Sequence, residues 1–413
     1  MVSLRPIPTA LVPVDSAAAE RVSARNYDEY LGDDDVRREI GERPDCILRV
    51  TMAHCDAGAG EVGEGSPEAL DRAARNLEEL ARGPLTRTVP DVLFVYEIDD
   101  PRRPGVRQIG LGGMASTREI RTEARPEGTV IRNEGIREEK ARGRARLVGR
   151  TGAFVGTVNL AVEDAEGRFA GALKAYADRT PEAYRATDED GCVHRVHLVE
   201  AAAAARTPLR EALAAEPLAY VADGNHRSAA ADMLGLDGYL AVFFPAATMG
   251  LAPYNRLVAG PRLDAAELLA GVREHFAVDR LEGVRAFQPE ALHRIGLYVD
   301  GVWYRLVPGP GSYDPGSAVD TVDADIVQRR LFGDVLGIAD PRDDRLTFVG
   351  AARDAHWLAL RVDAGDYAYA VTLPPVTMAQ FVRVCRQGRL MPPKSTWFRP
   401  KLRMGLVVAL LER

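Results

Sequence analysis

The stretch Leu218-Ala219-Tyr220-Val221-Ala222-Asp223-Gly224-Asn225-His226-Arg227-Ser228 passes from an apolar run through a polar turn into a new helix. Residues 218–222 predict a short buried strand, and the apolar residues after the turn, Ala229, Ala230, Met233 and Leu234, predict a helix. A helix N-terminus offers backbone N–H groups and a positive dipole end, and both favour a bound phosphate. The same pattern also suits a helix capped by Asp223 after a glycine turn. The pattern alone favours neither interpretation over the other.

The residue types in this turn suit an anion. Gly224 lets the backbone approach a ligand closely. His226 and Arg227 fall in the first helical turn, where positive charge is unfavourable for the helix unless an anion binds there. Ser228 adds a hydroxyl donor. Lysine is rare in this arginine-rich chain, and occurs only at positions 140, 174, 394 and 401. These positions are therefore candidates for sites that need a compact ammonium.

Composition excludes several classes of protein. The 413 residues carry a formal net charge of −7, which disfavours a nucleic-acid partner because such proteins normally show a basic excess. The four cysteines form no Cys-x-x-Cys pair, and this pattern is typical of free thiols in a reducing compartment. Residues 1–6 lack the long apolar stretch that is typical of a signal peptide, and no apolar run reaches the ~18 residues that span a bilayer. We therefore expect a soluble, cytoplasmic protein without a membrane partner.

Hydrophobic periodicity along the chain predicts an α+β fold, with mixed sheets and surrounding helices. Helices are expected at 67–82, 130–150, 264–275 and 320–335. Strands are expected at 46–50, 92–96, 107–111, 153–160, 193–199, 239–244, 295–299, 302–307, 346–349, 357–361 and 368–372. Three parts are predicted: an N-terminal α/β arm (1–90), a catalytic core (91–260), and a C-terminal α/β portion (261–413) packed on the core.

Three motifs, in order, resemble those of the family catalogued as domain of unknown function 1015. That family carries Ala-Asp-Gly-His-His-Arg, matched here by residues 222–227 with Asn225 in place of the first His. Its C-terminal signature is similar to residues 391–401, Met-Pro-Pro-Lys-Ser-Thr-Trp-Phe-Arg-Pro-Lys. Its central His-Glu with a charged helix is similar to Asn133-Glu134 and residues 138–140. Asn255 also stands where the family often has His, so the chain resembles a divergent member.

The family's Asp-Gly-x-His-Arg segment is similar to that of the ParB/sulfiredoxin superfamily, which includes free serine kinases. The resemblance therefore implies a ParB/sulfiredoxin-like core in which the turn holds a nucleotide phosphate. It implies ATP or ADP as donor, Mg²⁺ as cofactor, and a hydroxyl of a small molecule as acceptor, such as free serine or a related hydroxy amino acid. The oligomeric state stays open, and a homodimer is one arrangement that it allows.

On the template of phosphoryl transfer, residues 224–228 are predicted to hold the phosphates, with Arg227 contacting two oxygens at once. Asp223 is predicted to bind Mg²⁺ or to orient His226. Glu134 is the predicted base, although an exposed Glu in a charged helix would look the same. Further phosphate contacts are predicted for Lys140, Lys394, Ser395 and Thr396. The segment 391–401 equally suits a structural role, with its aromatic residues packed inside.

Other functions of the same fold are weighed against the kinase. Sulfiredoxin chemistry needs a cysteine where Asn225 stands, and a ParB-like DNA clamp needs a basic surface. A nucleotide hydrolase, in which water is the acceptor, and a non-catalytic nucleotide-binding regulator both remain open. The sequence thus predicts a nucleotide-dependent phosphotransferase, with these two functions as its alternatives.

Overall fold

The computed structural model describes residues 1–56, 62–204, 206–260 and 263–412, except for the side chain of Asp28. The chain divides into two compact units. Unit 1 comprises Met1–Arg132, Ile136–Met249 and Pro400–Arg413, and unit 2 comprises Asn133–Gly135 and Gly250–Arg399. Each unit therefore contains segments that are far apart in the sequence.

Unit 1 is built on a twelve-stranded mixed sheet. Its main path runs β5 (Val130–Arg132), β10 (Ala219–Asp223), β7 (Val158–Val162), β11 (Gly238–Pro245), β4 (Arg107–Ser116), β3 (Thr86–Asp99), β2 (Ile7–Pro13), β20 (Val408–Leu410) and β6 (Ala153–Phe154). Off this path, β1 (Leu4–Arg5) pairs with β4, and β9 (Val193–Val199) pairs with β3 and with β8 (Tyr184–Thr187). The predicted strand 218–222 is β10, which runs parallel to β5 and antiparallel to β7.

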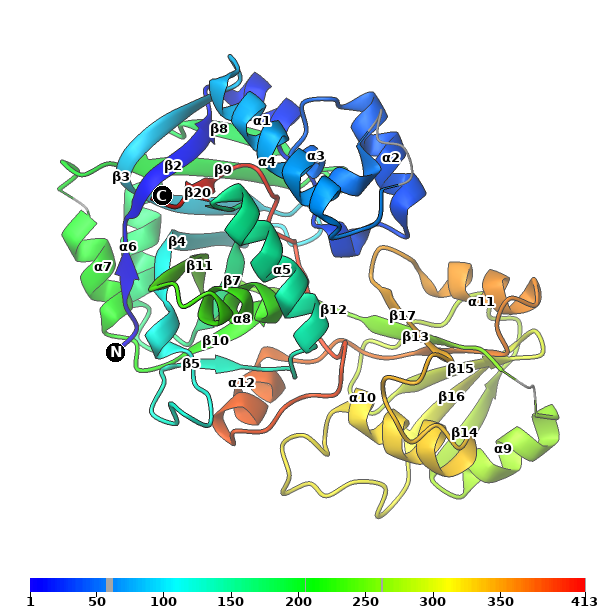
Figure 1. The fold of residues 1–413 in the computed structure, drawn as a ribbon. Coiled ribbons are helices and arrows are strands. Elements are labelled where there is room, and N and C mark those ends of the chain that lie inside the picture. The colour runs from blue at the N-terminus through cyan, green and yellow to red at the C-terminus, as the bar shows by residue number, and fades with distance from the viewer. Residues whose placement is uncertain (57–61, 205, 261–262, 413) are drawn as a thin grey trace. The chain divides into compact units, whose positions relative to one another are not determined.

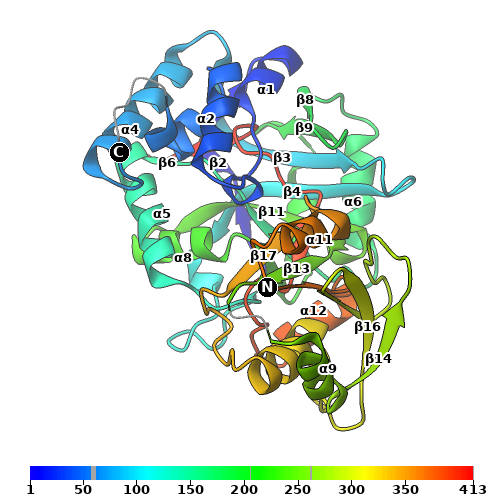
Figure 2. The ribbon, with the colours of Figure 1, turned by 90° about the vertical axis from the view of Figure 1, so that its right-hand side faces the viewer.

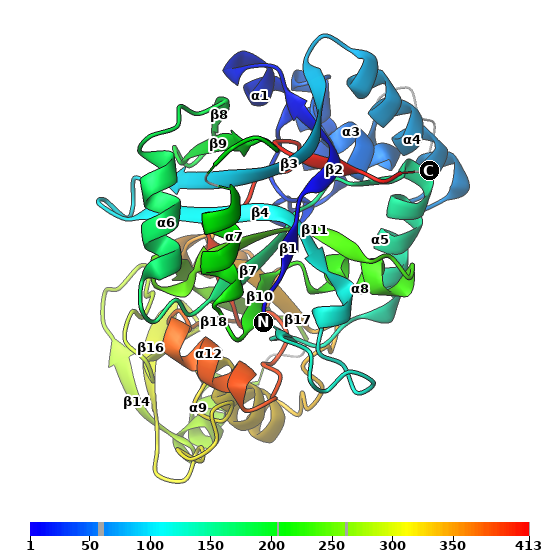
Figure 3. The same cartoon turned by 90° about the vertical axis from the view of Figure 1, so that its left-hand side faces the viewer.

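Helices cover both faces of this sheet. They are α1 (Ser16–Val22), α2 (Asp33–Glu42), α3 (Leu48–Thr51), α4 (Pro67–Arg82), α5 (Glu138–Thr151), α6 (Arg168–Ala177), α7 (Arg206–Ala214) and α8 (Asn225–Met233). Helices α6 and α7 lie together on one face, while α5 and α8 lie on the other (Figures 1 and 3). Short 3₁₀ turns include η1 (Tyr27–Glu29) and η2 (Ala53–Cys55). Buried apolar residues of α2, α3, α4 and η2 form one core cluster with Val155 and Met404.

Unit 2 contains a six-stranded antiparallel sheet (Figure 2). Its order is β14 (Phe276–Leu281), β16 (Val302–Pro308), β15 (Ile295–Val299), β18 (Tyr369–Thr372), β13 (Tyr254–Val258) and β17 (Leu346–Gly350). A separate ribbon pairs β12 (Gly250–Ala252) with β19 (Trp397–Arg399). The helices are α9 (Ala265–Arg273), α10 (Asp323–Ile326), the π-helix η5 (Val327–Val335), α11 (Ala355–Asp363) and α12 (Met378–Arg386). The fully buried Trp303 and Leu358 anchor the core between the sheet and α11.

The structure confirms the predicted α+β class and the strand–turn–helix at Asp223. Two predicted strands are wrong. Residues 46–50 enter helix α3, because a short apolar run does not by its pattern distinguish a strand from a buried helix. Residues 357–361 lie in α11, whose N-terminus is capped by Asp354 accepting a hydrogen bond from the Trp357 N–H at 2.8 Å. No helix in the described part of the chain is long and apolar enough to cross a membrane.

Candidate functional site

The turn between β10 and α8 has a backbone that only glycine adopts easily. Asp223 is the last residue of β10, and Gly224 follows with φ +99° as the N-cap of α8. A Cβ at this position would lie 2.8 Å from Arg227 Nε and 3.2 Å from Val158 Cα, both closer than ordinary contacts. The backbone at Gly224 thus lies too close to its neighbours to leave room for a side chain. The first turn of α8 begins directly beside the Asp223 carboxylate.

Two cations meet at this carboxylate. Arg227 Nη2 lies 3.2 Å from Asp223 Oδ2, and Lys401 Nζ lies 3.3 Å from the same oxygen. The Arg227 and Lys401 side chains are only 13% and 10% exposed, so solvent screens their charges poorly. Two cations thus meet at one carboxylate oxygen, and the N-terminus of α8 adds the positive end of its dipole. The Asp223–Arg227–Lys401 cluster is therefore suited to an anion.

Arg227 is held in position from a third direction. Its Nη1 donates a hydrogen bond to Asn26 Oδ1 at 3.0 Å. A Cβ at Gly156 would lie 3.1 Å from both Arg227 Cδ and Nη1, so the loop between β6 and β7 also lies against this side chain. A guanidinium fixed in this way loses little conformational entropy when it binds an oxyanion, and its fork can contact two oxygens.

The other residues predicted for the turn lie nearby in unit 1, in differing surroundings. His226 Nε2 accepts a hydrogen bond from the Arg137 N–H at 3.0 Å, so this ring nitrogen carries no proton in the arrangement seen. Ser228 is fully buried, and its hydroxyl donates to the Asn225 carbonyl at 3.0 Å within the same helical turn. Lys140 is exposed in the first turn of α5, a helix that packs against α8. Of these three side chains, the one of Ser228 thus forms a hydrogen bond within its own helix, α8.

A pocket of about 490 Å³ adjoins the cluster within unit 1. Arg227 and Gly156 line it on the side of the turn, and Arg144 stacks on the Tyr27 ring with 3.8 Å between its guanidinium carbon and the ring centroid. The remaining lining is mostly apolar: Leu147, Val148, Ala153, Phe154, Val155, Ala230 and Met404, with Asn26 and Thr51. Ligand pockets typically combine a mostly apolar wall with a few polar groups, as this one does.

Glu134 and the 391–396 segment come together in unit 2. Glu134 forms an isolated parallel bridge with Met391, whose N–H donates to the Asn133 carbonyl at 2.9 Å. The Asn133 side chain is buried and donates to Thr396 Oγ1 at 3.2 Å. Ser395 closes the turn by donating from its hydroxyl to the Pro392 carbonyl at 2.7 Å. Two motifs that are distant in the sequence are therefore neighbours in the fold.

The Arg256 side chain forms hydrogen bonds to the backbone of this segment. Its guanidinium, 3% exposed, donates to the carbonyls of Lys394 at 3.1 Å and Tyr254 at 2.8 Å, and it stacks on Phe348 at 4.5 Å. Burial lowers the pKa of Arg256 to about 10, although Tyr254 and Glu134 oppose that shift. A buried guanidinium is costly unless carbonyls surround it, so its position fixes the course of the chain at Lys394. Lys394 itself has a left-handed backbone, with φ +59°.

Mg²⁺ fits the Asp223 cluster poorly. Mg²⁺ requires oxygen ligands in near-octahedral geometry. In this cluster a single carboxylate is already shared by a guanidinium and an ammonium at 3.2 and 3.3 Å. A dication on Asp223 would stand next to two positive charges. The donors here fit a phosphate anion better than a metal ion.

Together, the fold and the turn define an α+β protein in which a carboxylate and two cations meet at a helix N-terminus. The chain belongs to the family described as "Protein of unknown function (DUF1015)", whose model matches residues 4–331. This match confirms the family that the motifs at residues 133–140, 222–227 and 391–401 predicted. The search of curated proteins gave no match.

Several solved structures are weakly similar to the chain. A free serine kinase in complex with AMP is 12% identical, with a TM-score of 0.36 over 65% of this chain and 83% of that one. A conserved hypothetical protein from Pyrococcus furiosus is 12% identical, with a TM-score of 0.34 over 65% and 87%. SbnI with a C-terminal truncation, from Staphylococcus aureus, is 9% identical, with a TM-score of 0.37 over 72% and 87%. None of these TM-scores reaches 0.5, so they do not tell what this chain binds.

Sequence reasoning assigned no role to three residues that shape these clusters. Lys401 reaches Asp223 from a segment 178 residues away. Asn26 binds Arg227 from 201 residues away. Arg256 follows Asn255, which stands where the family often has His, but nothing in the sequence indicated that Arg256 is buried. The scarcity of lysine was a signal that pointed toward position 401, since three of the four lysines lie in the family's motifs.

Proposed function

We propose that this protein is a nucleotide-dependent phosphotransferase that acts on the hydroxyl of a small molecule, with the nucleotide phosphates bound at the Asp223–Ser228 turn. The observation that carries the proposal is the pair of cations, Arg227 and Lys401, placed at the N-terminus of α8 within 3.3 Å of Asp223 Oδ2. Phosphate oxygens would replace the carboxylate as partner of these cations. The exchange is favourable because a phosphate chain carries more negative charge than one carboxylate.

The pocket beside Arg227 gives the nucleotide a second point of attachment. A base and ribose need a mostly apolar cavity, and the pocket beside Arg227 is lined mostly by apolar side chains. Because Arg227 lines both the pocket and the turn, a nucleotide with its base in the pocket would direct its phosphates toward Lys401. Recognition would then divide into an apolar part and a cationic part.

The reaction itself follows the chemistry of phosphoryl transfer. The acceptor oxygen bonds to the terminal phosphorus, the bond from that phosphorus to the bridging oxygen breaks, and the acceptor's proton passes to a base. ATP leaves as ADP, or ADP leaves as AMP. Catalysis consists mainly of positioning and of neutralising charge on the transferred group, which suits two fixed cations. Free serine and related hydroxy amino acids are the acceptors that the family resemblance implies, and it also implies Mg²⁺.

Glu134 is our proposed base. It belongs to unit 2, where the bridge to Met391 fixes its backbone and where the buried Arg256 contributes a positive charge. Glu134→Gln should abolish turnover and leave nucleotide affinity within a factor of about two, since the proton acceptor is not among the phosphate contacts. Glu127→Gln, an exposed carboxylate of unit 1, is the matched control and should retain turnover. Equal turnover in Glu134→Gln and the native protein would remove Glu134 from the mechanism.

The decisive experiment separates the kinase from its alternatives. The protein is incubated with ATP or ADP, Mg²⁺ and a panel of hydroxy amino acids, and phosphorus NMR follows the products. A new phosphomonoester supports the kinase, and free phosphate alone supports a nucleotide hydrolase. Nucleotide binding by calorimetry without either product supports a non-catalytic regulator. Absence of both binding and turnover would rule out the proposal.

A further inference from the structure

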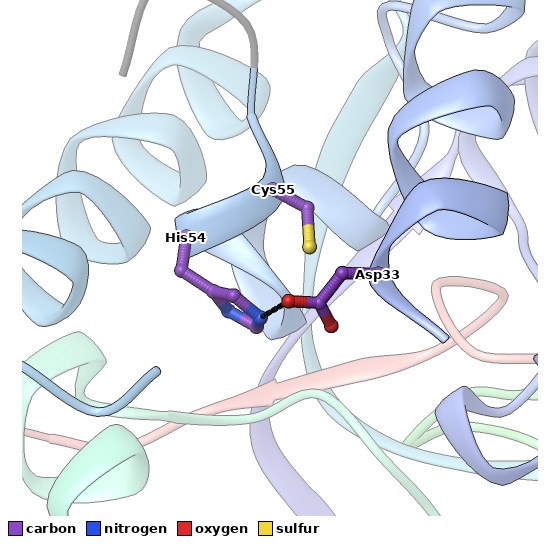
Figure 4. Close-up of side chains that lie close together, drawn as sticks. All are labelled: Asp33, His54 and Cys55. Atoms are coloured by element: carbon purple, nitrogen blue, oxygen red, sulfur yellow. Dashed lines mark ion pairs between the residues drawn. The ribbon is translucent and has the colours of Figure 1, made fainter. Parts of the chain in front are cut away.

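Three potential metal ligands lie together in unit 1, away from the Asp223 cluster. Asp33 is the first residue of α2, and His54 and Cys55 belong to η2 (Figure 4). One ligand atom from each residue lies within 4.8 Å of the others. Figure 4 shows the Asp33 carboxylate between the imidazole and the thiol. Two segments of the chain thus contribute a carboxylate, an imidazole and a thiol to one small space.

We propose that Asp33, His54 and Cys55 bind a divalent transition-metal ion, with Zn²⁺ as the best match. Zinc takes mixed oxygen, nitrogen and sulfur ligands in tetrahedral geometry, at about 2.0–2.3 Å. Two such ligands stand roughly 3.3–3.7 Å apart. His54 Nε2 and Asp33 Oδ2 are already 3.3 Å apart, so side-chain rotation at Cys55 completes a three-ligand set. The fourth position is then left to water or another small ligand.

The surroundings of the His54 imidazole support the binding of a metal ion at its Nε2. The His54 residue is 8% exposed, and its Nε2 makes no hydrogen bond in the described structure despite its closeness to Asp33. Leaving a buried polar atom without a hydrogen bond is unfavourable, and such atoms in native proteins commonly mark a bound ion or water. A metal ion on Nε2 would satisfy this nitrogen.

The surrounding charges permit a dication. Arg37 Nη2 lies 3.7 Å from Asp33 Oδ2, but its Nη1 pairs more closely with Asp34 at 2.8 Å. Arg37 therefore keeps a carboxylate partner when Asp33 turns to a metal. Glu64 adds negative charge near the thiol. Burial and the neighbouring Asp33 raise the pKa of Cys55 to about 11, so the metal must displace the thiol proton when it binds.

The consequence of binding is a cross-link between α2 and η2. Cys55 belongs to the core cluster that α2, α3 and α4 share, and the buried His54 precedes it in η2. An ion that binds the folded state but not the unfolded chain raises stability by mass action. Zn²⁺ should therefore raise the thermal unfolding temperature of this part of the protein. The proposal is independent of phosphoryl transfer.

The test uses the full chain, stripped with chelator and then titrated with Zn²⁺ or Co²⁺. We expect one Zn²⁺ per chain by elemental analysis, and a near-ultraviolet thiolate–Co²⁺ band in the absorption spectrum. Cys55→Ser should remove the band, and Asp33→Asn should weaken Zn²⁺ at least about tenfold, because even outer-shell partners cost 10–100-fold. Cys46→Ser is the matched control: Cys46 is buried in the same core cluster and should leave the band unchanged.

Any one of three results would overturn the proposal. These results are binding of less than half an equivalent of Zn²⁺ per chain, the absence of a thiolate band with Co²⁺, and a band that remains in Cys55→Ser. Circular dichroism establishes whether Cys55→Ser is folded. If it is not, Asp33→Asn decides the question, because the Asp33 side chain is 48% exposed and its replacement leaves the core intact. Unchanged Zn²⁺ affinity in Asp33→Asn then rules the site out.

Discussion

The Lys401 ammonium lies 3.3 Å from the Asp223 carboxylate, although 178 residues separate the two in the chain. Both residues belong to unit 1, because the chain returns there at Pro400. The contact joins the family's two most specific motifs, the Asp-Gly-Asn-His-Arg turn and the C-terminal Pro-Lys. A purely structural turn would need no second cation beside Arg227. This arrangement makes Lys401 the most informative residue to change.

Lys401→Met should weaken ADP and ATP binding roughly 10–100-fold, because a hydrogen bond to a charged group contributes about 1.5–3 kcal/mol. The substitution keeps the length of the side chain but removes one of the two positive charges beside the Asp223 carboxylate. Calorimetric titration with each nucleotide measures the effect. Lys174→Met is the control, since Lys174 is an exposed lysine of unit 1 that pairs with Asp178 on α6. Equal losses in both variants would show a general electrostatic effect instead of a site.

A second prediction concerns Gly224. Gly224→Ala should lower the free energy of unfolding by more than about 1–2 kcal/mol, which is the cost of a left-handed backbone for a residue with a Cβ. The additional cost comes from the Cβ, which would press on Arg227 Nε at 2.8 Å and displace it from Asp223. Nucleotide affinity should therefore fall together with stability.

Gly235→Ala separates these two effects. Gly235 also has a left-handed backbone, with φ +66°, but a Cβ there meets nothing within 4 Å. This variant should show the backbone cost alone and should bind nucleotide normally. Urea unfolding and calorimetry on both variants provide the comparison. A Gly224→Ala protein that binds nucleotide as well as Gly235→Ala does would show that the turn is not the phosphate site.

Local chemistry in the sequence was sufficient to predict the strand–turn–helix. The apolar run before Asp223 and the glycine after it leave few alternatives, and β10 and α8 lie where the pattern put them. The helix 67–82 was predicted from apolar residues at helical spacing, and in the structure it spans Pro67–Arg82 with Ser66 as its N-cap. These signals are short-range, so they can be recognised in one sequence.

The partners of the turn could not be predicted, because they depend on tertiary contacts. Asn26 and Lys401 approach Arg227 and Asp223 from 201 and 178 residues away, and neither distance leaves a local pattern. The helix at Leu48–Thr51 was missed because it has only four residues, of which Leu48 and Val50 are buried, and so short a segment shows no helical periodicity. The side-chain partners in a site thus cannot be predicted from a single sequence, because they depend on tertiary contacts.

A third prediction follows from the buried carboxylate of Glu97 on β3. Burial by itself raises the pKa of Glu97, but the neighbouring His197 imidazole and a hydrogen bond from Arg107 outweigh it and lower the pKa to about 2, from 4.5. Arg107 Nε lies 2.7 Å away. Because the folded pKa is the lower one, the carboxylate stabilises the fold above pH 4.5, and this contribution is lost as the pH falls toward 2.

Glu97→Gln should therefore flatten the acid dependence of stability between pH 4.5 and 2. The variant should also be less stable than the native protein at pH 7, since Arg107 and His197 lose a charged partner. Urea unfolding across a pH series measures both effects. Asp178 and Asp188, whose pKa values also lie near 2, keep some acid dependence in the variant. Identical slopes in the variant and the native protein would contradict the assignment to Glu97.

A fourth prediction separates the two parts of nucleotide recognition. Leu147→Trp should fill much of the pocket beside Arg227, because Leu147 is a partly exposed residue of α5 on its wall. We expect ADP affinity to fall at least about tenfold, since occupying the space removes the burial of the base, and burial contributes ~25 cal/mol per Å². Pyrophosphate affinity should change little, because pyrophosphate needs only the Asp223–Arg227–Lys401 cluster.

The control for this prediction places a tryptophan in a pocket that is not proposed to bind the nucleotide. Leu80→Trp adds the same indole to a different cavity of unit 1, of about 580 Å³, which Arg49 and Asn76 also line. ADP should bind this variant as it binds the native protein. Competition of ADP and of pyrophosphate against a fluorescent nucleotide measures all four affinities. If Leu147→Trp weakens pyrophosphate as strongly as ADP, the indole has displaced Arg227 and the result does not speak for a base in the pocket. If it weakens neither ligand, the base binds elsewhere, and the division into an apolar and a cationic part is wrong.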